Sequence, residues 1–426
     1  MMNVSREGKS AVTTEVSTRI GGTDGRPKRA VLTSLVLGAV LTAVVALVGG
    51  TPRQAEAAFS DKIVFLSART TGKGVNNPTG DLEVYSMNPN GTSLKQLTVN
   101  ETIEYLPTLS PDGRKITYVS YGVQASNPEG DTEVYVMNAD GSGQKNLSNN
   151  GANLSEWAPT FSPDGQKVAY QSGGVQTSNP EGDGEVYVMN ALDGTGNKNL
   201  TNTVGSIVDI APDFSPDGTK IAYSSEGVQI SNPEGDWEIY SLNALDGTGQ
   251  KNLTNTGPWV SEFFPDYSPD GTKIAYTGEG MQTSNPEGES EVFTMNADGN
   301  KRKNITNTGV EVYDDQPDYS PDGTKITFRS EGPQASNPEG DIEVYVMSAL
   351  DGSGQVNLSN NNADIPDRNP DFSSDGKKVV YETRNAQASN PEGDHEIYTV
   401  NVLDGSGQTN LTNNDATDTA AKWGGG

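Results

Sequence analysis

The sequence contains no cysteine and only one histidine, His395, in 426 residues. Without cysteine, the chain has no disulfide framework and no thiolate to act as nucleophile or metal ligand. A Ser-His-Asp catalytic set would have to use His395 itself. A chain of this length folds without disulfides when it buries a sufficiently large core. These absences favour a binding protein over enzymes that depend on cysteine or histidine.

Positive charge is also scarce. The chain carries 29 Lys and Arg against 57 Asp and Glu, a net charge of −28. Seven of the basic and four of the acidic residues lie in the first 57 positions, so the remainder carries −31. Such a surface repels phosphate backbones and anionic lipid headgroups and attracts cations, basic peptides and basic protein patches. We therefore expect no nucleic acid and no membrane surface as partner, although solubility alone also accounts for much of this charge.

Long apolar runs are confined to the N-terminal part. Basic residues between positions 26 and 29 precede an uncharged stretch, 30–52, and an Ala-Glu-Ala sequence at 55–57 offers a small-x-small cleavage site. This order predicts a secretory signal peptide. An uncleaved membrane anchor is the competing interpretation, because the stretch is nearly long enough to span a bilayer. We expect a cleaved protein that is secreted, periplasmic or on the cell surface, with these segments: signal peptide 1–57, its apolar part 30–50, and the mature domain 58–426.

Two motifs recur along the rest of the chain. Successive starts of the Ser-Pro-Asp-Gly motif are 52 or 53 residues apart. A fixed period of this size indicates one structural unit repeated around a ring or along a rod. The Glu-Val-Tyr copies run through Tyr85, Tyr135, Tyr187, Tyr240, Phe293, Tyr345 and Tyr398, and the Ser-Pro-Asp-Gly copies start at Ser110, Ser162, Ser215, Ser268 and Ser320, with a variant at Ser373.

One repeat predicts four short strands. Residues 156–161, 167–172, 185–190 and 197–201 alternate apolar and polar positions or are rich in strand-forming residues. Tight Asp-Gly turns separate the first strand from the second and the third from the fourth, and a long polar loop joins the second to the third. No sustained helical period occurs within the repeats. Four antiparallel strands in about fifty residues are typical of a propeller blade.

The ends of the repeat region favour a ring over an open solenoid, which needs atypical polar caps. The first unit opens at Lys62 without a first strand, and residues 418–423 form a first strand followed only by glycines. Pairing the last strand with the first unit removes the exposed edges of an open array. The sequence therefore predicts an all-β, seven-bladed β-propeller with four antiparallel strands per blade, closed by the C-terminal strand, which completes the first blade.

The motifs resemble a known family. Ser-Pro-Asp-Gly, Lys-Ile-Ala-Tyr, Glu-Val-Tyr-Val-Met-Asn-Ala-Asp-Gly and Asn-Leu-Thr occur in the order of the WD40-like (PD40) repeats of TolB-type β-propellers, across nearly all of residues 61–424. The resemblance implies an exported propeller that binds proteins, as TolB does in the Tol–Pal envelope system. TolB has six blades and shorter loops before Glu-Val-Tyr. The resemblance therefore extends to fold and binding mode and not to membership of that complex.

An acidic column defines the predicted binding site. Six residues before each Ser-Pro-Asp-Gly turn, or its equivalent in the last strand, stands an Asp or Glu. Because the first strand of a blade lines the channel, these carboxylates are expected to ring the channel mouth, where like charges raise one another's pKa. An equally direct structural reading is that each accepts backbone N–H bonds. The column comprises Glu104, Glu156, Asp209, Glu262, Asp314, Asp367 and Asp418.

A second set lies four residues further on, in consecutive blades only. The other blades have Thr108, Thr160 or Lys422 at this position, so one side of the channel is predicted to be more acidic. Such a funnel suits metal ions or a basic peptide. The set comprises Asp213, Asp266, Asp318 and Asp371.

The Asp-x-Glu pairs before each Val-Tyr, such as Asp131 and Glu133, are a weaker metal signal. Their oxygens suit Ca²⁺, the one cofactor the sequence suggests, but their spacing is not that of an EF-hand. A loop-ordering role, through bonds from Asn and Glu to the backbone, is an equal alternative.

Three hypotheses follow. The first, which we favour, is a monomeric, non-enzymatic propeller scaffold that binds a protein or basic peptide at the acidic channel face, with Ca²⁺ as an optional ligand. The second is a carbohydrate-binding or carbohydrate-active propeller that uses paired carboxylates. The third is a cation-dependent structural protein of the cell surface.

Overall fold

The computed structural model describes residues 61–151, 153–361, 365–384 and 388–424. The predicted signal peptide, 1–57, lies outside these residues. All described residues belong to one compact unit, Glu56–Gly426, and form strands, turns and loops without a helix. None of them therefore builds a helix that could cross a membrane. The predicted all-β class is confirmed.

The strands repeat in groups of four. The first strands are β28 (Asp418–Trp423), β4 (Ile103–Leu109), β8 (Ser155–Phe161), β12 (Val208–Phe214), β16 (Ser261–Tyr267), β20 (Tyr313–Tyr319) and β24 (Asp367–Phe372). The second are β1 (Ile63–Ser67), β5 (Lys115–Tyr121), β9 (Lys167–Gly173), β13 (Lys220–Glu226), β17 (Lys273–Glu279), β21 (Lys325–Glu331) and β25 (Lys378–Thr383).

The third and fourth strands follow the same rule. The third are β2 (Glu83–Met87), β6 (Thr132–Asn138), β10 (Glu185–Asn190), β14 (Glu238–Asn243), β18 (Glu291–Asn296), β22 (Glu343–Ser348) and β26 (Glu396–Asn401). The fourth have two residues each: β3 (Lys95–Gln96), β7 (Lys145–Asn146), β11 (Lys198–Asn199), β15 (Lys251–Asn252), β19 (Lys303–Asn304), β23 (Val356–Asn357) and β27 (Thr409–Asn410).

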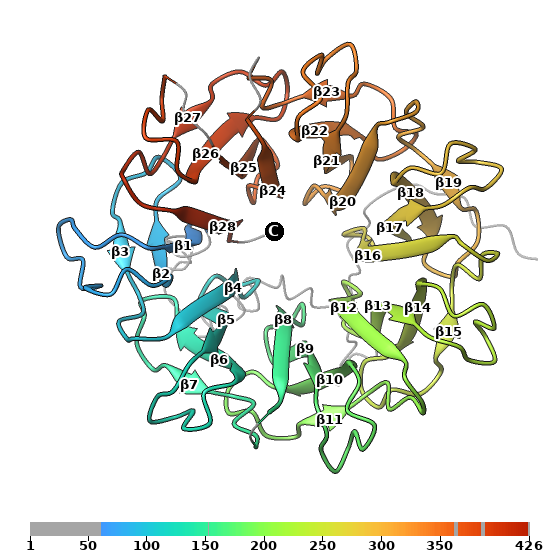
Figure 1. Cartoon of the computed structure of the whole chain (residues 1–426), viewed down its shortest axis with the longest axis horizontal. Helices are drawn as coiled ribbons and strands as arrows, with labels where there is room; N and C mark the ends of the chain where they lie inside the picture. The colour runs from blue at the N-terminus through green and yellow to red at the C-terminus, as the bar shows by residue number, and fades with distance from the viewer. Residues whose placement is uncertain (1–60, 152, 362–364, 385–387, 425–426) are drawn as a thin grey trace, which may run out of the picture. The chain divides into compact units, whose positions relative to one another are not determined.

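Each group forms an antiparallel meander in chain order. Two groups, β4–β7 and β8–β11, are joined into one eight-stranded sheet by a single parallel bridge between Thr132 and Ser155. The last strand, β28, pairs with β1 and gives a sheet in the order β28-β1-β2-β3. Figure 1 shows the groups arranged around a common centre, with the first strand of each group nearest to it.

The strands predicted for the repeat 156–201 agree with the structure to within one residue, except the fourth, which is shorter than predicted. Its first three strands are β8, β9 and β10, and its fourth is β11. The tight turn between β8 and β9 is fixed by Asp164, whose Oδ1 accepts bonds from the Ser162 hydroxyl at 2.6 Å and the Gln166 amide at 3.0 Å.

The hydrophobic core lies between neighbouring sheets. Val186 packs in a cluster with Phe214, Ile221 and Tyr223 of the following sheet, whereas Tyr187 packs in a cluster with Val134 and other residues of the preceding sheet. This division follows from the two-residue period of a strand, which sends successive side chains to opposite faces. The Val and Tyr of Glu-Val-Tyr are therefore packing residues.

Candidate functional site

The seven acids predicted to ring a channel mouth are instead buried. Their exposed fractions are 0–1%. Glu156 illustrates their surroundings: its Oε1 accepts bonds from Asn150 Nδ2 at 2.8 Å and Ser172 Oγ at 2.9 Å. The predicted solvent-facing ring is thus wrong for Glu104, Glu156, Asp209, Glu262, Asp314, Asp367 and Asp418, and these side chains lie where neighbouring sheets meet.

A β-bulge in every first strand explains the error. In β12, Ile210 pairs with Ser224, and the next pair joins Asp213 to Ala222, so one strand advances by three residues while its partner advances by two. The bulge residue Ala211 has a φ of 52°. An inserted residue reverses the alternation of side chains beyond it. In a regular strand, Asp209 and Asp213 would share one face because they are four residues apart. The bulge between them places the two side chains in different environments.

The second acidic set meets solvent more than the first. Asp213, Asp266 and Asp318 are half-buried between buried neighbours in their strands. Each influences the pKa of another in the set, which places them close together although they come from successive sheets. Burial and this mutual repulsion raise the pKa of Asp213 to about 7, and raise the pKa values of Asp266 and Asp318 well above the usual range.

These aspartates also tie the first strands of successive sheets together. Asp213 Oδ2 accepts the backbone N–H of Tyr267 at 2.9 Å, and Asp266 Oδ2 accepts that of Tyr319 at 2.7 Å. The fourth member, Asp371, accepts a bond from the Trp423 amide and lies 3.2 Å from Lys422 Nζ. In each of these aspartates one carboxyl oxygen accepts a backbone N–H from the next sheet, which leaves the other oxygen available. At the last member, Asp371, the positive charge of Lys422 lies beside the carboxyl group.

The most varied side chains near the centre belong to a column that the sequence reasoning passed over. The residue directly after each buried acid is half-buried or exposed in every sheet. Four consecutive first strands present apolar side chains there and three present polar ones. The column comprises Tyr105, Trp157, Ile210, Phe263, Asp315, Arg368 and Thr419, which we call the rim column.

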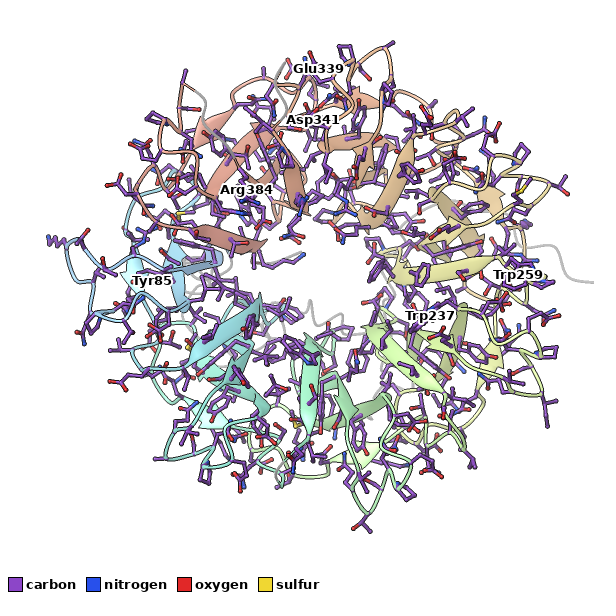
Figure 2. All side chains as sticks on the ribbon, viewed as in Figure 1. Tyr85, Trp237, Trp259, Glu339, Asp341 and Arg384 are labelled. Carbon is purple, nitrogen blue, oxygen red and sulfur yellow. The ribbon has the colours of Figure 1, made fainter. Side chains whose placement is uncertain are left out.

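The apolar part of the rim column includes two separate groups of contacting rings. Tyr105 and Trp157, from neighbouring sheets, have ring centroids 5.3 Å apart, and Phe263 lies 5.5 Å from Trp237 and 6.1 Å from Phe264. Phe264 is a bulge residue and is 43% exposed. Figure 2 labels Trp237 and, farther from the centre, Trp259, which is 89% exposed. The rings of Tyr105, Trp157 and Phe263, which we call the aromatic arc, offer apolar contact surface.

The polar part of the rim column carries paired charges. Arg329 donates to both carboxylate oxygens of Asp315 across β20 and β21, and one of these bonds is 2.7 Å long. Arg368 is exposed at the next position. His395 is half-buried directly before the third strand of the same group, and burial lowers the pKa of its imidazole. The two sides of the rim therefore differ in chemistry although the backbone repeats.

The Asp-x-Glu pairs order loops and sheet junctions. Asp183 Oδ2 accepts the amide of Ile207 at 3.0 Å, and Glu185 Oε1 accepts that of Thr203 at 2.9 Å. In each long loop a buried Asn, such as Asn179, donates to one backbone carbonyl and accepts one amide N–H. The loop-ordering interpretation is borne out by these bonds. Among the described residues, no group of three or more Asp, Glu or His side chains is arranged to hold a metal ion, so Ca²⁺ has no support here.

Comparison with known proteins identifies the repeat. A family model described as the TolB beta propeller domain matches residues 54–285, more than half of the chain. The chain belongs to this family. A TolB homolog of Chlorobium luteolum is 31% identical over 201 residues, which are 46% of this chain and 40% of that protein. The uncharacterized peptidase YuxL of Bacillus subtilis is 26% identical over 247 residues, 58% of this chain and 32% of that protein. This chain thus spans two fifths or less of the curated relatives it matches.

Solved structures share the β-propeller fold. The β-propeller domain of the Trilobed protease from Pyrococcus furiosus aligns with a TM-score of 0.55 at 14% identity, over 83% of this chain and 93% of that one. Oligogalacturonate lyase from Vibrio parahaemolyticus aligns with a TM-score of 0.54 at 14% identity, over 82% and 85%. At this identity the likeness shows the fold alone. The relatives include proteins named as enzymes, so family membership does not by itself decide between enzyme and scaffold.

The rim column gives no repeated signal in the sequence, because its residues differ from one repeat to the next. Repeats of a scaffold keep the residues that hold the backbone, and the buried acids were conspicuous for that reason. Residues that differ between copies while staying partly exposed are better candidates for recognition. Reading one position further along each first strand, from Glu156 to Trp157, would have found the aromatic arc in the sequence.

Proposed function

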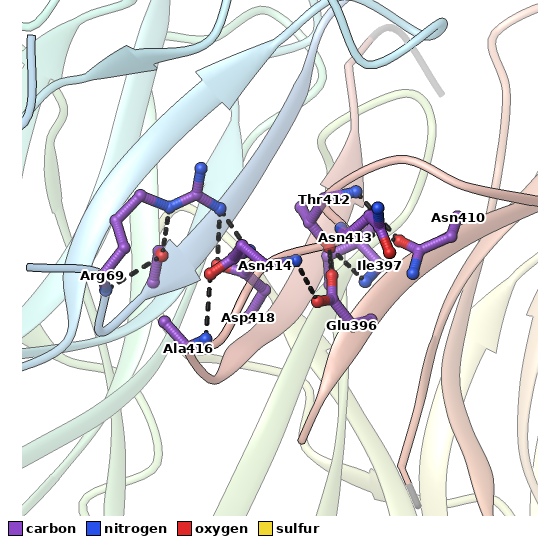
Figure 3. Close-up of polar contacts among 10 residues, drawn as sticks. Arg69, Glu396, Ile397, Asn410, Thr412, Asn413, Asn414, Ala416 and Asp418 are labelled. Atoms are coloured by element: carbon purple, nitrogen blue, oxygen red, sulfur yellow. Dashed lines mark hydrogen bonds and ion pairs between the residues drawn. The ribbon is translucent and has the colours of Figure 1, made fainter. Parts of the chain in front are cut away.

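We propose that residues 58–426 form a closed seven-bladed propeller and that residues 1–57 are a signal peptide removed on export. The seven groups of strands support the blade count, and the pairing of β28 with β1 supports closure. Arg69 strengthens that pairing, because its Nη2 donates to both oxygens of Asp418 at 2.8 Å (Figure 3). The mature protein is then a secreted, periplasmic or cell-surface monomer.

This propeller acts as a non-enzymatic scaffold that binds a protein or a basic peptide at the centre of the ring. The proposal rests on the aromatic arc of Tyr105, Trp157 and Phe263. Phe263 lies on β16 with Asp266, and Trp157 lies on β8, the first strand before β12, which holds Asp213. Aromatic side chains are frequent anchors in protein interfaces, and the aspartates select a positively charged partner. The mature net charge of −31 steers such partners toward the surface and keeps nucleic acid and anionic membranes away.

Partner capture from an envelope extract tests this proposal with two variants of the full-length chain. Trp157→Ala removes apolar contact area, and the pair Asp213→Asn with Asp266→Asn removes two ionisable carboxyl groups while leaving an oxygen to accept the Tyr267 and Tyr319 amides. We expect each variant to lose at least about tenfold in affinity, since an anchor of this type contributes about 2 kcal/mol or more.

Two controls match these variants. Trp259→Ala removes an exposed tryptophan outside the rim column, and Glu181→Gln removes an exposed carboxylate from a long loop. Both are expected to capture the partner as the unaltered chain does. Equal capture by all four variants would place the binding surface elsewhere.

A carbohydrate ligand is the second candidate. Its support is the combination of half-buried rings, on which a sugar can stack, with nearby carboxylates, which accept hydrogen bonds from sugar hydroxyls. A glycan array and a hydrolysis assay on the full chain test it. Binding of an uncharged glycan that Trp157→Ala abolishes would favour this candidate over the peptide, and a blank result in both assays would discard it.

A further inference from the structure

A pair of buried carboxyl groups recurs where neighbouring sheets meet. Each pair joins the Glu of Glu-Val-Tyr in one sheet to the acid at the start of the first strand in the next. All members are at most 2% exposed. The pairs are Glu83 with Glu104, Glu133 with Glu156, Glu185 with Asp209, Glu238 with Glu262, Glu291 with Asp314, Glu343 with Asp367, and Glu396 with Asp418.

The pair Glu83 and Glu104 shows the arrangement most completely. Asn100 bridges the two, because its amide N–H donates to Glu83 Oε1 at 2.8 Å and its side chain to Glu104 Oε1 at 3.0 Å. Thr102 and Ser120 also donate to Glu104 Oε1, at 3.0 and 3.1 Å. The donors thus converge on one oxygen of each group.

The remaining oxygens lack donors. Glu83 Oε2 and Glu104 Oε2 are both buried with no hydrogen-bond partner among the described residues. Burying an ionised carboxylate oxygen without a donor lowers the stability of the fold, and two such carboxylates close together repel each other. One proton between them turns two unsatisfied acceptors into a donor and an acceptor. It also removes one of the two negative charges.

At four other junctions only the first-strand acid keeps a buried oxygen without a donor among the described residues: Glu156 Oε2, Asp209 Oδ1, Asp314 Oδ1 and Asp367 Oδ1. The facing Glu at each of these junctions has its Oε2 satisfied by a Ser or Thr hydroxyl, as Glu185 does by Thr201. The linker between sheets again bridges the pair: Thr308, for example, donates its backbone N–H to Glu291, and its hydroxyl oxygen lies 3.1 Å from Glu291 and 3.0 Å from Asp314. The bridging residue is Asn or Thr at each junction, and neither can neutralise a charge.

The junction that joins the two ends of the chain is different. There Arg69, and not a proton, neutralises Asp418 through two bonds of 2.8 Å. The guanidinium also lies 5.1 Å above the Tyr85 ring. Because a fixed positive charge balances the buried acids at this junction, we expect the other junctions to need a proton in its place.

We propose that the other six junctions each bind one proton between their two carboxyl groups, and that these junctions weaken together as the surroundings become alkaline. The paired acids are then proton-binding sites built into the scaffold. The protein holds its sheets together most firmly in mildly acidic surroundings.

The electrostatic surroundings agree with this assignment. Burial and the charge of Glu83 raise the pKa of Glu104 to about 9, and burial and Glu133 raise the pKa of Glu156 to about 8. The groups facing the first pair are Asp81, which adds negative charge, and the phenols of Tyr85 and Tyr118, whose pKa values are raised by burial. At its junction, the positive charge of Arg302 lowers the pKa of Glu262 and so partly offsets the increase caused by Glu238.

The direction of the pH effect follows from the sign of the shifts. A carboxyl group whose folded-state pKa is raised stabilises the fold fully below its unfolded value of about 4, and this contribution is lost as pH rises through the folded value. The window runs from about pH 4 to the values of about 8 and 9 for Glu156 and Glu104. His395, with a lowered pKa, acts in the opposite direction, but it is a single group.

Thermal unfolding of the full chain across this window tests the proposal, together with the infrared band of protonated carboxyl groups. We expect the unfolding midpoint to fall between about pH 6 and about pH 9, and the protonated-carboxyl band to be present at neutral pH. Glu104→Gln places an N–H permanently between the groups. It should shrink the band, raise the midpoint at pH 9 relative to the unaltered chain, and flatten the pH dependence.

Exposed Glu181→Gln is the matched control and should change neither readout. If Glu104→Gln does not fold, Glu156→Gln and the infrared titration of the unaltered chain still decide the question. A midpoint that stays constant or rises from pH 6 to pH 9, or a neutral-pH spectrum without the band, would overturn the proposal. A rise in midpoint with added Ca²⁺ that Glu104→Gln abolishes would assign the pairs to a cation instead.

Discussion

At the scale of single residues, one inserted position in each first strand decides which acids are buried and which meet solvent. The bulge residues Ala158, Ala211 and Phe264 have φ values of 50–54°. Only glycine adopts this region freely, and other residues lose about 1–2 kcal/mol there. Every repeat tolerates this cost, so the bulge is a regular part of the first strand. Next to it, the rim-column residue is partly exposed to solvent and the preceding acid is buried.

Glycine at the bulge should therefore stabilise the chain. Ala211→Gly relieves the left-handed strain but gives the unfolded chain more freedom, which offsets about 0.4–1 kcal/mol of the gain. We expect a net increase of about 0.5 kcal/mol in the free energy of unfolding by urea. Ala222→Gly, in the neighbouring strand β13 and fully buried, should lower it by about 1 kcal/mol. A loss of stability in both variants would argue against strain at the bulge.

At the scale of elements, the strands were predictable and the bulge was not. Turn residues such as Ser162 to Gly165 and the period-two pattern of Glu-Val-Tyr fixed strand positions because local chemistry determines them. The bulge has no such signature: Leu106, Ala158 and Gln316 share no property that predicts a positive φ. The expectation that acids four residues apart in a first strand share one environment therefore failed, and with it the predicted ring of seven carboxylates.

The long loops show the opposite case. Asn179 and its counterparts hold the Ser-Asn-Pro-Glu-Gly-Asp loops through one donated and one accepted bond to the backbone. Asn side chains commonly order turns in this way, so the role was foreseeable from composition. What the sequence did not reveal was that the bridging Asn or Thr of the next linker ties together carboxyls from two sheets, because the partners are far apart in the chain.

At the scale of the whole molecule, the proposed closure rests on one ion pair as well as on the pairing of β1 with β28. Arg69→Ala would leave Asp418 buried without its cation, and breaking a buried pair in this way destabilises a protein by about 3–5 kcal/mol. We expect a loss in this range for the full chain, measured by urea unfolding. Arg114→Ala removes an exposed partner of Asp112 at 3.9 Å and should cost less than about 1 kcal/mol. A similar small loss for both would mean that Arg69 contributes little to closure.

The repeated residues and the varied rim column have different roles. Junction acids, packing tyrosines and ordered loops are nearly the same in every copy and hold the sheets. The rim column changes from Tyr105 and Trp157 on one side to Asp315 and Arg368 on the other, so the proposed binding surface has different chemistry on its two sides.

Hydrogen–deuterium exchange of the full chain, with and without the captured partner, tests whether the partner binds at the rim column. We expect the partner to protect the backbone amides of β4, β8, β12 and β16 and to leave those of the outer strands β7, β11 and β15 unchanged. Protection confined to the outer strands or to the Ser-Pro-Asp-Gly turns would contradict binding at the rim column.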